Sequence, residues 1–110
     1  MTLPTVSNET VYRSVSNQSI DFDHDETPGD VTEALFYIRD EIDGTVYFRL
    51  KYSDDPGQWT ISADGTGSIA FLDDDLTDIK DGNYVYDIKL ETASTNIAYQ
   101  RGTIDIIGDV

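Results

Sequence analysis

The stretch that decides the fold is DGNYVYDIKLETASTNIAYQRGTIDIIGDV, residues 81–110. Large apolar side chains occupy every second position in its first part: Tyr84, Tyr86, Ile88 and Leu90. A period of two is typical of a β-strand with one buried face. A turn signal at 81–82 precedes this strand, and a polar turn at 94–96 separates it from a second apolar stretch at 97–107. The segment therefore predicts two strands joined as a hairpin.

The last strand changes phase part way along. Ile97 and Tyr99 stand at odd positions, whereas Ile104 and Ile106 stand at even ones. One additional residue in the strand accounts for this slip, and glycine tolerates the backbone geometry that a β-bulge requires. We therefore expect a β-bulge at Gly102.

A second hairpin is predicted in the middle of the chain. Residues 31–39 and 45–52 both alternate between apolar and polar side chains, and Asp43 and Gly44 lie between them. Asp-Gly is a dipeptide typical of tight hairpin turns. The two segments are therefore expected to pair as antiparallel strands.

Two tyrosines of this hairpin are candidate partner-binding residues. The alternation directs Tyr37 and Tyr47 to the outer face, where a tyrosine pair is suited to a sugar or to a contact between subunits. Ordinary cross-strand pairing on a half-covered sheet explains the same two residues without any ligand.

Shorter strands are predicted elsewhere, at 10–15, 18–23, 59–63 and 67–72. The first two are expected to be one edge strand that breaks at Ser16 and Asn17, and Trp59 is expected in the core. Leu72, Leu76 and Ile79 have helical spacing, which predicts a helical turn before Tyr84.

About seven strands at spacings of about 8–12 residues, with turns between them, favour an antiparallel sandwich. The sequence therefore predicts an all-β, Ig-like antiparallel β-sandwich over residues 10–110, preceded by a flexible lead-in at residues 1–9. Tyr84 stands where such sandwiches have a corner tyrosine.

Composition excludes several classes of function. The chain has 110 residues, 22 acidic and 7 basic side chains, a net charge of −15 and no cysteine. A surface so acidic repels nucleic-acid phosphate, and without cysteine there is neither a disulfide nor a thiolate metal site. Residues 1–11 lack the basic start and apolar core of a signal peptide. The chain is therefore expected to be intracellular at synthesis, or exported as a part of something larger.

The excess of aspartate has two explanations, and the sequence leaves both open. Aspartate is a common turn residue, so a soluble domain rich in strands and loops accumulates it. A dense acidic surface is also an adaptation to high salt, because salt screens its self-repulsion.

Catalysis is not expected. His24 is the single histidine, it lies in DFDHDET without a nucleophile motif nearby, and it is expected in a solvated loop or edge. The five glutamates do not form a distinctive carboxylate motif.

Calcium is the only cofactor that the sequence suggests. Asp21, Asp23 and Asp25 have the spacing that opens an EF-hand loop, but Glu26 stands where that loop requires glycine. A second candidate is the acidic run at 73–75, which includes Asp73 and Asp75, together with Asp78. Solvated acidic surface is the alternative explanation at both places.

The C-terminal third resembles small Ig-like domains of tailed-phage structural proteins, which include baseplate, head–tail accessory and decoration proteins. The resemblance is carried by DGNYVYDI at 81–88, GTIDI at 102–106 and the closing Asp109 and Val110. It implies a non-catalytic protein located in the virion that attaches to other virion proteins and to copies of itself, without nucleic acid or membrane. G-x-Y-x-Y also occurs in Ig-like modules of bacterial adhesins. The alternative is therefore a carbohydrate-binding or adhesin module of a cell-surface protein.

Overall fold

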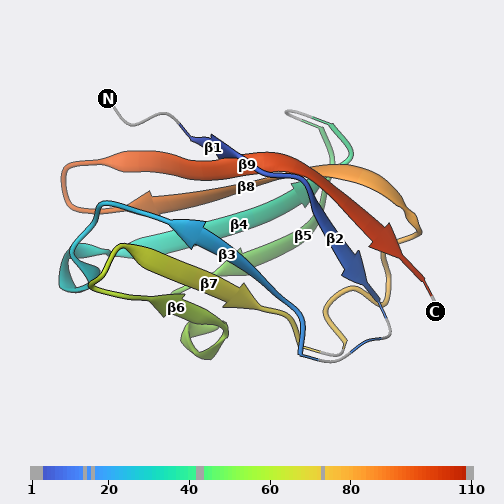
Figure 1. The fold of residues 1–110 in the computed structure, drawn as a ribbon, viewed down its shortest axis with the longest axis horizontal. Helices are drawn as coiled ribbons and strands as arrows, with labels where there is room; N and C mark the ends of the chain where they lie inside the picture. Colours follow the sequence, from blue (N-terminus) through green and yellow to red (C-terminus); the bar gives the residue numbers. More distant parts are fainter. Residues whose placement is uncertain (1–3, 14, 16, 42–43, 73, 109–110) are drawn as a thin grey trace.

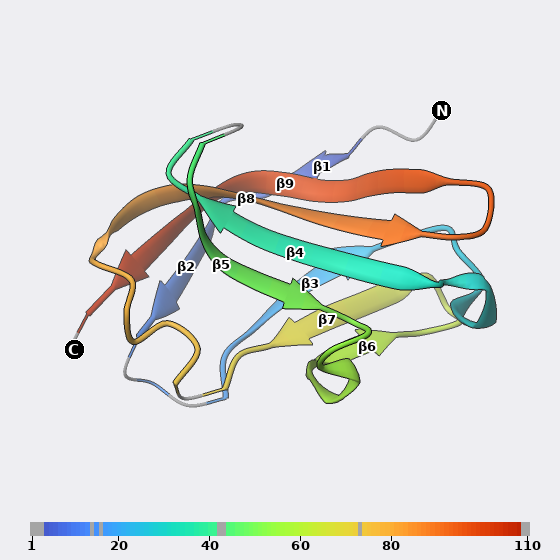
Figure 2. The ribbon, with the colours of Figure 1, turned by 180° about the vertical axis from the view of Figure 1, so that it is seen from behind.

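The computed structural model describes residues 4–13, 15, 17–41, 44–72 and 74–108, which fold into two β-sheets that face each other (Figures 1 and 2). The strands are β1 (Thr5–Val6), β2 (Glu9–Tyr12), β3 (Ser19–Asp23), β4 (Glu33–Arg39), β5 (Val46–Lys51), β6 (Trp59–Ile61), β7 (Thr66–Ala70), β8 (Gly82–Glu91) and β9 (Asn96–Ile107). Two short 3-10 helices, Pro28–Asp30 and Pro56–Gln58, are the helical segments of the described chain. Neither has the length or the apolar character to cross a membrane.

The larger sheet has the order β1-β9-β8-β4-β5, with β2 also paired to β9, and the smaller sheet has the order β3-β7-β6. β1 and β2 run parallel to β9, and all other pairs are antiparallel. This is the strand order of an immunoglobulin-like sandwich in which the N-terminal strand has joined the larger sheet. The predicted fold class is confirmed. Thr5, Val6 and Glu9, which the sequence assigned to the lead-in, are part of this sheet.

The prediction of a single edge strand over 10–15 and 18–23 is wrong. β2 belongs to the larger sheet and β3 to the smaller one, so the chain crosses between the sheets after Tyr12. The side chain of Gln18 holds this crossing: its Oε1 accepts the N–H of Tyr12 at 2.8 Å, and its Nε2 donates to the carbonyl of Val15 at 2.9 Å. Asn17 adopts a φ of 63°, a conformation that asparagine tolerates better than most residues.

The core contains two groups of aromatic rings, one around Phe36 and one in which Phe22 contacts His24 and Trp59. Phe36 lies within 6.0 Å, centroid to centroid, of Phe48, Phe71 and Tyr86. Ile88 and Leu90 continue the buried face of β8, as their alternation predicts. Trp59 is buried as expected. The apolar periods of the strands thus meet between the two sheets.

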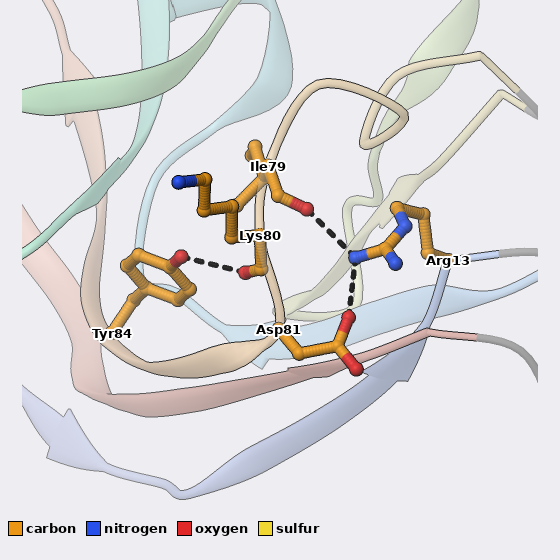
Figure 3. Close-up of polar contacts among 5 residues, drawn as sticks. All are labelled: Arg13, Ile79, Lys80, Asp81 and Tyr84. Atoms are coloured by element: carbon orange, nitrogen blue, oxygen red, sulfur yellow. Dashed lines mark hydrogen bonds and ion pairs between the residues drawn. The ribbon is translucent and has the colours of Figure 1, made fainter.

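The corner before β8 is built from polar contacts around Tyr84 (Figure 3). The hydroxyl of Tyr84 donates to the carbonyl of Lys80 at 2.6 Å, as a corner tyrosine does. Arg13, at the end of β2, donates to the carbonyl of Ile79 at 2.7 Å and forms an ion pair with Asp81 at 2.6 Å. Hydrogen bonds lower the pKa of the Asp81 carboxyl: the larger effect comes from the N–H of Gly108 and the next from the side chain of Arg13.

The predicted helical turn over 72–79 is a series of tight turns. The N–H groups of Asp75, Thr77 and Ile79 each donate to the carbonyl three residues earlier. Leu76 and Ile79 are buried, as their spacing predicts, but Leu72 is 59% exposed. Two of the three apolar residues therefore fix this segment to the core.

The bulge in β9 lies at Tyr99 and not at Gly102. Ile88 pairs with Gln100 and Lys89 pairs with Ala98, so Tyr99 is the additional residue. Tyr99 and Gln100 consequently both face inward, and both are buried. Gly102 serves a different purpose, because a Cβ atom there would clash with the carbonyl of Ser7. Its missing side chain lets the β1–β2 segment lie against β9.

The predicted hairpin of β4 and β5 is confirmed, with one irregularity. Ile38 pairs with Phe48 and Arg39 pairs with Val46, which leaves Tyr47 as a bulged residue. Asp43, half of the predicted turn dipeptide, lies outside the described residues.

Candidate functional site

The outer face of the larger sheet carries most of the cationic side chains of this acidic chain. Outward positions on β4, β5, β8 and β9 are those that alternate with buried residues. They include five of the seven basic residues of the sequence, which we term the basic face: Arg39, Arg49, Lys51, Lys89 and Arg101. The same outward positions also carry four carboxylates, Glu33, Asp87, Glu91 and Asp105. Five cations therefore slightly outnumber four anions on this face, whereas the whole chain has a net charge of −15.

The strand register aligns a row of side chains across this face. Arg49 lies opposite Tyr37, and Tyr37 lies opposite Asp87. Asp87 in turn lies opposite Arg101, which is paired with Val6 at the sheet edge. The row thus joins residues from five strands, which belong to three separate segments of the sequence.

Tyr37 orders the guanidinium groups on one side of the row. The guanidinium carbon of Arg39 lies 5.1 Å, and that of Arg49 5.4 Å, from the centroid of the Tyr37 ring. Both distances are within the range of cation–π attraction. Tyr37 therefore restricts the two arginine side chains and lowers the entropy that they lose on binding a partner.

A groove of about 350 Å³ crosses the centre of the basic face. Its lining residues come from β1, β4, β8 and β9: Val6, Tyr37, Arg39, Val85, Tyr86, Asp87, Arg101, Gly102 and Thr103. Oδ1 of Asp87 is buried without a hydrogen-bond partner among the described residues. A buried carboxylate oxygen without a hydrogen-bond donor favours binding of a ligand or water molecule that supplies one.

The two predicted partner-binding tyrosines do not form one surface. Tyr37 lies beneath Arg39 and Arg49, whereas the bulge turns Tyr47 toward the corner, where its ring centroid is 5.3 Å from that of Tyr84. Tyr47 is 48% exposed. Their role in binding a partner stays a prediction.

The calcium candidates are dispersed. Asp21 and Asp23 project from the outer face of β3, and Asp25 is exposed after that strand ends. Asp75 instead closes a turn, because its Oδ2 accepts the N–H of Leu72 and the side-chain amide of Gln58, both at 2.8 Å. Asp73 lies outside the described residues. Within the described ranges, no three acidic or histidine side chains are placed to share a metal ion.

His24 is buried, at 4% exposure, and the prediction of a solvated histidine is wrong. Its Nδ1 accepts the N–H of Glu26 at 3.1 Å, and its Nε2 lies 3.1 Å from the carbonyl of Thr66, so Nε2 carries the proton. The signal was present in the sequence, since His24 continues the inward alternation of Ile20 and Phe22.

Sequence reasoning also missed the basic face. The alternation of residues 45–52 is enough to direct Arg49 and Lys51 outward, but the gathering of five basic residues depends on strand order and register. No local sequence signal marks this gathering, because strand order and register are set by pairing between residues far apart in the sequence.

Comparisons with known proteins give limited information. No protein-family model matches the chain, and no curated protein matches it. The structure of the NK cell receptor NKp44, described as a triggering partner in natural cytotoxicity, aligns over 98% of this chain and 100% of its own length, with 10% identity and a TM-score of 0.47. The structure of murine CRIg aligns over 97% of this chain and 94% of its own, with 14% identity and a TM-score of 0.40. The Ig-like class follows from the strand order and the corner tyrosine of this chain.

Proposed function

We propose that this protein is a non-catalytic attachment domain whose basic face binds an acidic surface on a partner protein. The observation that carries the proposal is the gathering of Arg39, Arg49, Lys51, Lys89 and Arg101 on one sheet face of a chain with a net charge of −15. Opposite potentials steer and orient partners, and like potentials reject wrong ones. The basic face therefore differs in charge from the remaining surface, which is mostly acidic, and we expect it to be the face that an acidic partner contacts.

The single histidine supports a binding role over catalysis. Both ring nitrogens of His24 are engaged and the ring is buried between Phe22 and Tyr99, with centroid distances of 6.1 and 6.3 Å. A substrate therefore cannot reach His24, and the ring cannot serve as a general base. The groove on the basic face holds arginine, aspartate and tyrosine, which suit recognition by charge and hydrogen bonding.

The resemblance of residues 81–88 and 102–106 to phage structural domains supports a location in a tailed-virus particle, as a capsid decoration, head–tail or tail component. Attachment by a rigid sandwich suits that setting, because the sheets hold the basic side chains in place. Mass spectrometry of purified virus particles tests the location. Recovery of this chain with capsid or tail proteins is expected, and its absence from intact particles would overturn the location.

The attachment face is tested by reversing its charge. We expect Arg49→Glu with Arg101→Glu to reduce retention on purified particles at least tenfold, because two aligned cations are replaced by anions. Lys80→Glu, an exposed change outside the face, is the control and should retain wild-type binding. Equal retention of the double variant and the control would contradict the proposed function.

The alternative, a carbohydrate-binding or adhesin module, requires an open aromatic surface. The guanidinium groups of Arg39 and Arg49 already lie over the Tyr37 ring, and Tyr47 contacts Tyr84. This arrangement favours protein attachment over sugar stacking. A glycan array separates the two functions, because a sugar signal lost in Tyr37→Ala but retained in Arg49→Glu would support the alternative.

A further inference from the structure

We infer that copies of this chain associate head to tail, with the basic face of one copy docked on the outer face of the smaller sheet of the next. The inference rests on the proposed attachment function, because it names a partner for the same face. The partner is a second copy of the chain, and the argument is the complementary charge of two faces on opposite sides of one sandwich (Figures 1 and 2).

The outer face of the smaller sheet is acidic and polar. Asp21 and Asp23 are both exposed on β3, where they alternate with buried Ile20 and Phe22. Their strand neighbours across the sheet are Ser68 and Thr66 on β7. The outward positions of β3, β6 and β7 hold no basic residue.

A hollow of about 440 Å³ lies on this face, and we term it the acidic hollow. Asp21 and Asp23 line it together with the hydroxyl side chains of Thr60, Thr66 and Ser68. Carboxylates and hydroxyls are the acceptors that a guanidinium or ammonium group requires. The hollow is therefore chemically suited to receive side chains from the basic face.

The spacing of the charges also agrees. Asp21 and Asp23 are two residues apart on one face of β3, and Arg49 and Lys51 are two residues apart on one face of β5. Along a β-strand two residues span about 6.6 Å. Both strands end the order of their sheets, so neither pair is flanked on its far side by another strand. The two carboxylates of one copy can thus contact the two cations of the next copy, because both pairs have the same spacing along their strands.

Such a contact uses different surfaces on the two copies. It is therefore heterologous and leaves one free face at each end, so growth continues with concentration instead of stopping at a dimer. Exposed ion pairs are weak, so we expect the association only at high protein concentration. The net charge of −15 repels copies at a distance, and 0.15 M salt shortens that repulsion to about 8 Å.

The test is sedimentation of the purified chain in 0.15 M NaCl, from micromolar concentrations to about 1 mM, a range suited to weak exposed ion pairs. We expect the mean mass of the wild-type protein to rise steadily with concentration. Asp21→Lys with Asp23→Lys removes the acidic hollow, and Arg49→Glu with Lys51→Glu removes part of the basic face. Each double variant alone should stay monomeric.

A mixture of the two double variants is the decisive sample. One retains an intact basic face and the other an intact acidic hollow, and the two reversed faces are also complementary to each other, so the mixture should recover the rise of mean mass with concentration that neither variant shows alone. Asp74→Lys with Asp78→Lys changes the net charge as Asp21→Lys with Asp23→Lys does, at exposed residues of the turns before β8 that belong to neither face, and should associate like the wild type.

Three outcomes would overturn the inference: a wild-type chain that stays monomeric throughout, an acidic-hollow variant that associates like the wild type, or a mixture that stays monomeric. Failure here is distinct from failure of the proposed function. If self-association is absent but Arg49→Glu with Arg101→Glu still abolishes retention on particles, the attachment function stands and only the partner is different.

Discussion

The hydroxyl of Tyr86 donates a hydrogen bond of 2.8 Å to the carbonyl of Ser7, a residue 79 positions earlier in the chain. The same hydroxyl accepts the side-chain amide of buried Gln100 at 3.0 Å. Tyr86 lies two residues after the corner tyrosine, the position at which antibody domains carry the second cysteine of their inter-sheet disulfide. This chain, which has no cysteine, places there a phenol that connects β8 to the N-terminal segment.

Tyr86→Phe is expected to lower the free energy of unfolding by about 1–3 kcal/mol, because Ser7 and Gln100 lose a buried partner while the ring remains. Urea unfolding followed by fluorescence measures the change. Tyr12→Phe, at a tyrosine that is 39% exposed, is the control and should change stability little. A loss in Tyr86→Phe no larger than in the control would show that the hydroxyl contributes nothing.

Gly102→Ala should separate the N-terminal segment from β9, because the new Cβ meets the carbonyl of Ser7. Overpacking of this kind costs about 1–3 kcal/mol. Faster hydrogen exchange is expected at the amide of Ser7, which donates to the carbonyl of Arg101 at 3.0 Å. Gly57→Ala has open space around its Cβ and should be neutral or slightly stabilising. Equal exchange rates in the two variants would refute a role for Gly102 in close approach.

Tyr84→Phe removes the hydrogen bond to Lys80 and should cost about 0.5–1.5 kcal/mol. The loss is expected to concentrate in the corner at 76–81, where Arg13 also contacts Ile79 and Asp81. Amide chemical shifts in that corner, compared with those of the distant β6–β7 pair, report the effect. Changes distributed evenly over both regions would contradict a local role.

The raised pKa of Tyr99 leads us to expect a loss of folding stability at high pH. Burial, and then the hydrogen bond that its hydroxyl donates to Glu26, raise the pKa of Tyr99 from about 10 to about 12. The fold therefore favours the neutral phenol. This stabilisation is complete below pH 10, the ordinary pKa, and is lost as the pH rises toward 12.

Urea unfolding at several pH values measures this loss. Tyr99→Phe should be less stable than the wild type at neutral pH, but its stability should decline less between pH 10 and 12. Tyr12→Phe, at a partly exposed tyrosine, should keep the wild-type decline. Parallel decline in the wild type and Tyr99→Phe would exclude Tyr99 as a source of the alkaline loss.

The local sequence pattern was sufficient to predict the strands but not their arrangement in the two sheets. The alternation of Tyr86, Ile88 and Leu90 identified the buried face of β8, since strand periodicity is a property of neighbouring residues. The separation of β2 from β3 was not visible, because it depends on the pairing of β2 with β9 about 95 residues away. The phase slip in β9 was detected, but it is equally satisfied by a bulge at Tyr99 or at Gly102.

The candidate site depended still more on distant relationships. Outward arginines on β4, β5 and β9 become one face only when register aligns Arg49, Tyr37 and Arg101 across four strands. The bulge that turns Tyr47 away from Tyr37 is likewise set by pairing and not by local sequence. Sequence alone therefore located candidate residues but not the surface that they form.

The parallel pairing of β2 with β9 has a consequence for synthesis. Glu9 to Tyr12 of β2 pair with Ile104 to Ile107 of β9. Because β2 is synthesised long before β9, it cannot pair until β9 has been made. Sheet contacts between such distant residues form slowly, because the intervening chain must be ordered first. Strands β4 and β5 are made well before β9 and can pair with each other without it. Until β9 emerges, the apolar side chain of Val11 lacks its native partner and is exposed to chaperones or to neighbouring nascent chains.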